Sequence, residues 1–167
     1  MAAFDININD RHRLDWQILQ NGWTSLYYQI SILDNDLNWF RSEKYEIIDF
    51  DCQLWTEEER MHKDFKKKLD FPDYYGENFN ALNDCLSEYE IKGSGTVIVF
   101  HNFHNVDKSI AHTLLDIFAL SSRQHILFGE KLLTFVQVDN PNYQIEPVGA
   151  TPVLWNGAEW LNSNRGL

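Results

Sequence analysis

The chain has 167 residues, and its 25 acidic and 14 basic side chains give a formal net charge of −11 at pH 7. Apolar residues make up 44% of the chain, which excludes a disordered protein and is enough for a substantial core. An acidic surface repels nucleic-acid phosphates, and no stretch approaches the roughly 18 apolar residues of a membrane span. We therefore expect no nucleic acid and no membrane as partner, and a cytoplasmic protein whose two cysteines, Cys52 and Cys85, stay reduced.

The N-terminal part is expected to add a strand and a helix to the core. Residues 1–23 are polar and irregular, and residues 24–29 are predicted to form a short strand. Ser31 is expected to cap a helix over residues 32–44, in which apolar side chains recur at positions i, i+4 and i+7. The segment YEIIDF, residues 45–50, has the composition of a second strand.

Two further helices are predicted on either side of a turn. Thr56 and Glu59 have the spacing of a capping box, so a helix is expected to begin there and to run to residue 70. After Pro72, apolar residues recur with helical period over residues 77–90. The side chains predicted to be buried are Met61, Phe65 and Leu69 in the first of these helices, and Phe79, Leu82, Leu86 and Tyr89 in the second.

Strands and helices alternate in the second half of the chain. Residues 96–100 (TVIVF) form a continuous apolar run between turn residues, which indicates a strand covered on both faces. A helix from residue 108 and a strand over residues 131–138 follow, while residues 152–155 and 160–161 are expected to pack as an edge strand and a terminal turn. This order predicts an α/β fold with a small, mostly parallel sheet of three core strands plus edge strands, flanked by helices.

The segment over residues 73–90 concentrates negative charge, because it carries five acidic side chains and no lysine or arginine. Asn83 and Asp84 lie three and four positions after Asn80, so all three project from the helix side opposite the buried stripe. An exposed acidic and amide-bearing surface of this kind suits a positively charged partner.

The turn before this helix could take part in the same surface. Gly76 lacks a Cβ, which lets the backbone of a partner approach closely, and Tyr74 and Tyr75 offer rigid aromatic area beside it. Composition alone favours the plainer interpretation, in which the acids are solvated charges and the tyrosines are half-buried packing residues.

The run FPDYYGENFNALNDCLSE, residues 71–88, resembles the recognition segment of the barstar family of intracellular ribonuclease inhibitors. In that family the segment fills the active site of a small basic ribonuclease, where a helix aspartate takes the place of a substrate phosphate. The resemblance assigns this role to Asp84, an aromatic contact at the rim of the active site to Tyr74, and the close backbone approach to Gly76. The rest of the implied contact surface is Tyr75, Glu77, Asn80 and Asn83.

The resemblance covers residues 45–139 in element order. It implies a barstar-like domain over that range, an N-terminal extension over residues 1–44 and a C-terminal segment over residues 140–167, both packed on the core. The implied protein is a non-enzymatic inhibitor of the immunity or antitoxin type, without a cofactor, that binds a basic ribonuclease or nuclease-like toxin in a 1:1 complex.

The chain departs from the family pattern at three positions. A second binding aspartate of the family corresponds to Asn80, a tryptophan corresponds to Asn83, and an acid from the following helix falls near Leu120. We therefore expect a cognate enzyme other than barnase. The alternative is a protein-protein interaction module of the same fold whose partner is not a nuclease.

A metal site is the remaining alternative. His101 and His104, followed by Asp107 and His112, are residue types that bind metals, and they would suit a small metallohydrolase. Residues three apart on a strand point to opposite faces, so we interpret these histidines as surface residues and expect no metal.

Overall fold

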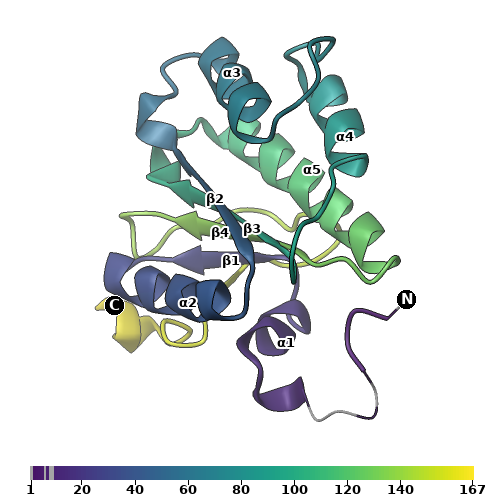
Figure 1. Cartoon of the computed structure of the whole chain (residues 1–167). Helices are drawn as coiled ribbons and strands as arrows, with labels where there is room; N and C mark the ends of the chain where they lie inside the picture. The colour runs from purple at the N-terminus through teal and green to yellow at the C-terminus, as the bar shows by residue number, and fades with distance from the viewer. Residues whose placement is uncertain (1, 6, 8–9) are drawn as a thin grey trace.

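The structure is a computed structural model that describes residues 2–5, 7 and 10–167. Its centre is a five-stranded sheet in the order β2-β3-β4-β1-β5, and every neighbouring pair of strands is parallel (Figure 1). The α/β fold predicted from the sequence is confirmed, and the sheet is parallel throughout. The strands are β1 (Thr24–Tyr27), β2 (Glu46–Asp51), β3 (Thr96–His101), β4 (Leu132–Gln137) and β5 (Leu154–Trp155).

Five α-helices cover the two faces of this sheet (Figure 1). On one face α2 packs with α1 beside it, and on the other face lie α3, α4 and α5. None of the helices in the described residues is long and apolar enough to cross a membrane. The helices are α1 (Leu14–Leu19), α2 (Ile30–Ser42), α3 (Glu58–Lys68), α4 (Phe79–Ser87) and α5 (Lys108–Ile126).

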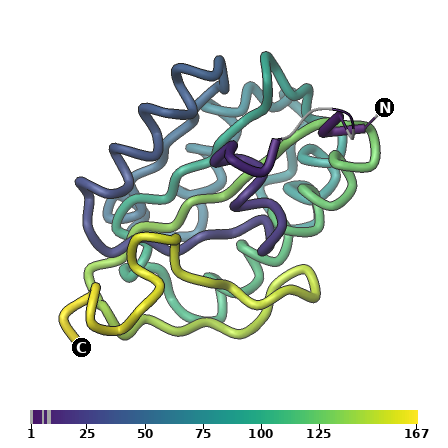
Figure 2. Tube along the Cα trace, turned by 90° about the horizontal axis from the view of Figure 1, so that it is seen from below, coloured from purple at the N-terminus to yellow at the C-terminus, as the bar shows by residue number. Residues whose placement is uncertain are grey.

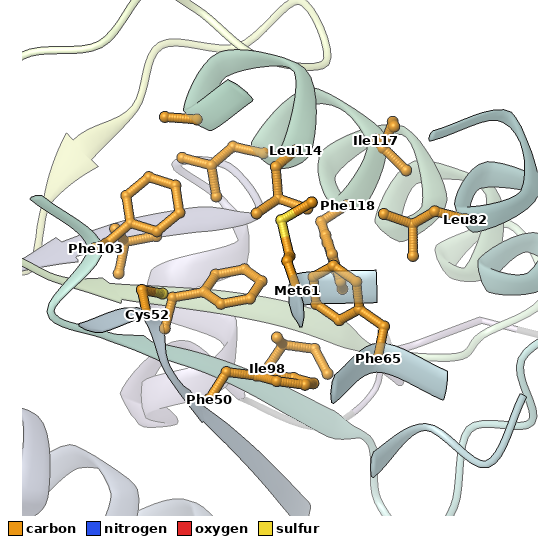
Figure 3. Packing of buried hydrophobic residues seen from close by; sticks show 14 of the residues in the cluster. Phe50, Cys52, Met61, Phe65, Leu82, Ile98, Phe103, Leu114, Ile117 and Phe118 are labelled. Carbon is orange, nitrogen blue, oxygen red and sulfur yellow. The ribbon is translucent and has the colours of Figure 1, made fainter. Parts of the chain in front are cut away.

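The larger core lies between the sheet and helices α3, α4 and α5. Phe50 of β2 packs against Phe65 of α3 with ring centroids 5.0 Å apart (Figure 3), and the ring of Phe100 on the neighbouring strand β3 lies 6.3 Å from that of Phe65. Leu82 of α4 and Phe118 of α5 are fully buried in the same cluster. The continuous apolar run at residues 96–100 therefore serves both cores, because its alternate side chains point to opposite faces of the sheet.

The N-terminal part is fixed to the sheet by a buried carboxylate. Asp15 is fully buried and accepts hydrogen bonds from Arg13 Nε (3.1 Å) and from the hydroxyl of Tyr45 (2.6 Å). Lys131 Nζ lies 3.7 Å from the same carboxylate. Burial alone would raise the pKa of Asp15, but the hydrogen bonds from Arg13 and Tyr45 and the nearby positive charges lower it overall.

A second buried carboxylate fixes the C-terminal part, which runs beside β1 (Figure 2). Glu159 is fully buried and accepts hydrogen bonds from the backbone N–H groups of Tyr28 (2.9 Å) and Gln29 (3.1 Å), at the start of α2. The sheet thus takes strands from all three predicted parts of the chain. The division of the chain at residues 44 and 139, into an N-terminal extension, a barstar-like domain and a C-terminal segment, remains a proposal.

Two predicted helix caps are wrong. Helix α2 begins at Ile30, one residue before Ser31, and its N-cap residue Gln29 makes no side-chain capping bond. Helix α3 begins at Glu58 after Glu57 in extended conformation, so Thr56 lies outside the helix. Local spacing indicated both caps, but each helix is displaced by one or two residues from the predicted start, which is the range over which helix ends vary.

Two further boundaries and one packing prediction also differ. Helix α4 begins at Phe79 and ends at Ser87, so it is shorter than the predicted 77–90 at both ends. The edge strand predicted near the C-terminus is present as β5, but Trp160 and Leu161 are 49% and 61% exposed and do not pack as a buried turn.

Candidate functional site

The predicted binding segment consists of a loop over residues 69–78 followed by helix α4. Asp70 has a left-handed backbone conformation (φ 52°) that ends helix α3, and the Tyr75 N–H closes a turn on the carbonyl oxygen of Pro72 at 2.9 Å. Asn78 then caps α4, since its Oδ1 accepts a hydrogen bond from the Ala81 N–H at 2.8 Å and its Nδ2 donates to the carbonyl oxygen of Gly76 at 3.1 Å. The loop is therefore joined to the helix by local hydrogen bonds.

The inner side of the loop is fastened to helix α3 by a histidine and a tyrosine. His62 is fully buried and Tyr75 is 5% exposed, and His62 Nδ1 lies 2.6 Å from the Tyr75 hydroxyl. The other ring nitrogen, Nε2, is buried without a hydrogen-bond partner among the described residues and faces the Glu58 carboxylate at 3.5 Å, which favours the tautomer with the proton on Nε2 and the hydroxyl donating to Nδ1. Burial lowers the pKa of His62, against the raising effect of Glu58, and this keeps the imidazole neutral.

Tyr75 consequently differs from its predicted role. The sequence placed both tyrosines of the turn on the binding surface, but the ring of Tyr75 packs 5.0 Å from that of Phe71 inside the fold. Burial raises the pKa of the Tyr75 hydroxyl, which stays protonated and able to donate to His62. Tyr75 holds the loop in place and cannot offer aromatic area to a partner.

The outer side of the loop and helix carries the other predicted residues. Tyr74 is 79% exposed. Gly76 and Glu77 are exposed beside it, and Glu77 has a left-handed backbone (φ 51°). The remaining predicted contact residues, all exposed along one side of α4, are Asn80, Asn83 and Asp84.

Gly76 also has a reason within the chain to lack a side chain. A Cβ at this position would lie 3.1 Å from Asn78 Nδ2, the amide that bonds back to the Gly76 carbonyl oxygen. A side chain here would require Asn78 Nδ2 to shift by a few tenths of an ångström, and it would also occupy space that a partner could approach.

Asp84 lies in the middle of α4 with its carboxylate directed into solvent. Among the described residues, no hydrogen bond or ion pair reaches this carboxylate, and the Ser87 hydroxyl donates to the backbone oxygen of Asp84 at 2.7 Å. Its neighbour Cys85 is half-buried, and burial together with the charges of Glu88 and Asp84 raises the pKa of the thiol. Cys85 is therefore protonated and unsuited to nucleophilic chemistry.

The histidines considered as metal ligands are separated in the structure. His101 Nε2 lies 3.6 Å from Asp49, His104 Nε2 lies 3.2 Å from Asp139, and His112 contacts the carbonyl oxygen of Pro147. Asp107 caps helix α5 through the N–H of Ser109 at 3.0 Å. Within residues 2–5, 7 and 10–167, no three metal-binding side chains lie together.

Sequence reasoning missed two residues that shape the site, His62 and Asn78. The signal for Asn78 was available, because asparagine is among the preferred N-cap residues and stands directly before the first helical residue. The partner of His62 is 13 positions away, and no local pattern predicts that contact.

Comparisons with known proteins identify a family for most of this fold. A family model described as "Barstar (barnase inhibitor)" matches residues 45–137, more than half of the chain. The chain is also similar to the "Putative ribonuclease inhibitor YrdF" of Bacillus subtilis (strain 168), with 66% identity over 29 residues. The aligned segment is 17% of this chain and spans about a third (32%) of that relative's length.

Proposed function

The chain belongs to the barstar family, and on that premise we propose that it inhibits a basic ribonuclease by binding over the active site of that enzyme. Proteins of this family are inhibitors and not enzymes. In the proposed complex the loop over residues 72–78 and helix α4 enter the active site, and Asp84 takes the position of a substrate phosphate.

The observation that carries this proposal is the exposed carboxylate of Asp84, which no other described residue binds. A ribonuclease must present Arg, Lys or His side chains to the phosphate of RNA, and a carboxylate held there accepts charge-assisted hydrogen bonds from the same groups. Helix α4 is fixed through buried Leu82 and Leu86, so Asp84 is presented with little further loss of conformational freedom. A carboxylate has no scissile bond, so the enzyme is blocked without turnover.

The surroundings of Asp84 support the same assignment. The whole segment over residues 73–90 is acidic, which favours encounter with a basic enzyme. The exposed ring of Tyr74 offers the kind of rigid aromatic contact that often contributes much of the affinity at protein interfaces.

The amides Asn80 and Asn83 bear on which enzyme is bound. Both are exposed near Asp84 and carry donors and acceptors without charge, so they suit polar groups on the partner better than further cations. This favours a cognate ribonuclease other than barnase. It is also the observation that keeps a non-nuclease partner as the second candidate.

The test is inhibition of RNA cleavage by a panel of small basic ribonucleases that includes barnase. We expect at least one to be inhibited at a 1:1 ratio, with inhibition lost or weakened by about a hundredfold or more in Asp84→Ala, as for truncation of a central charged contact. The matched control is Asp34→Ala, an exposed aspartate of α2 on the opposite face of the sheet. If no enzyme is inhibited, or if the two variants behave alike, the phosphate-mimic proposal is wrong.

A further inference from the structure

A groove of about 210 Å³ lies directly beside the proposed binding surface, between the loop over residues 69–74 and the C-terminal end of α4. The buried side chains of Leu69 and Phe71 line it, and the exposed Tyr74 forms part of its wall. The volume is smaller than the roughly 300 Å³ at which small-molecule sites begin. The groove therefore has the size for one long side chain of a partner.

The rim of the groove is acidic. The exposed carboxylates of Asp70, Glu88 and Glu90 line it. Among the described residues, none of the three forms an ion pair or a side-chain hydrogen bond. Glu88 follows Asp84 by four positions, so it lies one helical turn further along the same side of the chain. The groove is thus continuous with the surface that carries Asp84.

We propose that this groove receives an arginine side chain of the ribonuclease, with the guanidinium between the Tyr74 ring and the Glu88 and Glu90 carboxylates. This inference rests on the proposed function for the source of the arginine. The apolar lining residues Leu69 and Phe71 suit the methylene stem of arginine, the Tyr74 ring suits its planar cation, and the exposed carboxylates of Glu88 and Glu90 can accept its N–H donors. The groove would add a second cation contact to the one made by Asp84.

Lys92 is the one cation among the residues that line the groove, and it is exposed. Its ammonium would compete with an incoming guanidinium for the rim carboxylates, although the described residues contain no ion pair that uses it. Removing this charge should therefore strengthen binding of a guanidinium, while removing Glu88 should weaken it.

The first test titrates the full chain with N-acetyl-L-arginine methylamide and follows backbone amide signals by NMR. We expect weak binding with shifts concentrated in residues 69–74 and 85–92. The dissociation constant should rise about threefold in Glu88→Gln, as for loss of one exposed ion pair, and stay unchanged in the charge-matched control Asp34→Asn. In Lys92→Met it should fall.

The neutral isostere N-acetyl-L-citrulline methylamide separates charge recognition from simple filling of the groove. We expect it to cause no comparable shifts. Equal shifts with citrulline, shifts scattered over the surface, or an unchanged dissociation constant in both Glu88→Gln and Lys92→Met would overturn the inference.

The second test places the groove in the complex. For any ribonuclease that the chain inhibits, Glu88→Gln should raise the inhibition constant about threefold while Asp84→Ala has the much larger effect. An unchanged inhibition constant in Glu88→Gln would remove the groove from the interface and leave the role of Asp84 intact. If no ribonuclease is inhibited, the proposed function fails. Arginine binding in the first test would then mean that the arginine comes from a partner that is not a ribonuclease.

Discussion

The contact between His62 and Tyr75 should be measurable through the single substitution Tyr75→Phe. The change removes only the hydroxyl, so the ring contacts with Phe71 are kept, while His62 Nδ1 is left in the core without a partner. A buried polar atom that loses its hydrogen bond costs about 1–3 kcal/mol, so we expect a loss of about 2 kcal/mol in the free energy of unfolding. For a chain of this size that corresponds to a fall of about 4–8 °C in Tm.

The assay is urea unfolding of both single variants, Tyr75→Phe and Tyr74→Phe, at pH 7.5. The neighbouring tyrosine is the matched control, because Tyr74 is 79% exposed and its hydroxyl makes no hydrogen bond within the described chain. We expect Tyr74→Phe to unfold like the unchanged protein, with the same dependence on urea. A difference of less than about 0.5 kcal/mol between the two variants would refute the argument, since surface substitutions alone vary by that amount.

The same contact gives stability a pH dependence whose sign follows from the lowered pKa of His62. The unfolded chain binds the histidine proton more readily than the folded chain, so stability should be complete above the ordinary pKa of about 6.5 and should fall as the pH drops below it. In His62→Gln this part of the pH dependence should disappear. If the free energy of unfolding depends on pH in the same way in His62→Gln, that dependence arises from another group.

Three more outcomes are expected. The association rate with an inhibited ribonuclease should fall steeply between about 20 and 300 mM salt, because steering by the charges around Asp84 is screened; a flat response would contradict it. Asp15→Ala should lower the free energy of unfolding, measured with urea, by roughly 3 kcal/mol, because Arg13 and Lys131 lose a buried partner. In the unchanged protein the stabilisation by the Asp15 carboxylate should be lost only as the pH falls below about 4. Glu88→Gln should raise the free energy of unfolding by about 0.5 kcal/mol, since it removes a like-charge neighbour of Asp84 and an acid at the C-terminal end of a helix; a loss of stability would disprove this.

Periodicity predicted the elements whose side chains repeat regularly. The run at residues 96–100 became the buried strand β3, and the stripe of Met61, Phe65 and Leu69 is buried, with Leu69 at the C-cap of α3. These patterns hold because a strand or helix must bury one face wherever it lies in the fold. The resemblance over residues 71–88 then indicated which exposed face could bind a partner.

The turn and the two flanking parts could not be predicted in the same way. A turn has no period, so nothing local distinguished Tyr74, which faces solvent, from Tyr75, which bonds a histidine on the preceding helix. The buried carboxylates depend on still longer contacts, since Glu159 bonds backbone groups about 130 positions earlier in the chain. A sequence shows that such a residue is acidic, and only the fold shows what neutralises it.

The placement of charge separates the residues that hold the fold from those that face a partner. Asp15 and Glu159 are buried and fully engaged by hydrogen bonds, as burial of a carboxylate requires. Asp84 and Glu88 are exposed, one turn apart, and within the described part of the chain no ion pair or hydrogen bond uses either carboxylate; Glu88 also lies at the end of α4, where the helix dipole disfavours an acid. Stability of the isolated chain gives no reason for this second pair. A cationic surface on a partner does, because it would turn the repulsion between the two carboxylates into attraction to the bound protein.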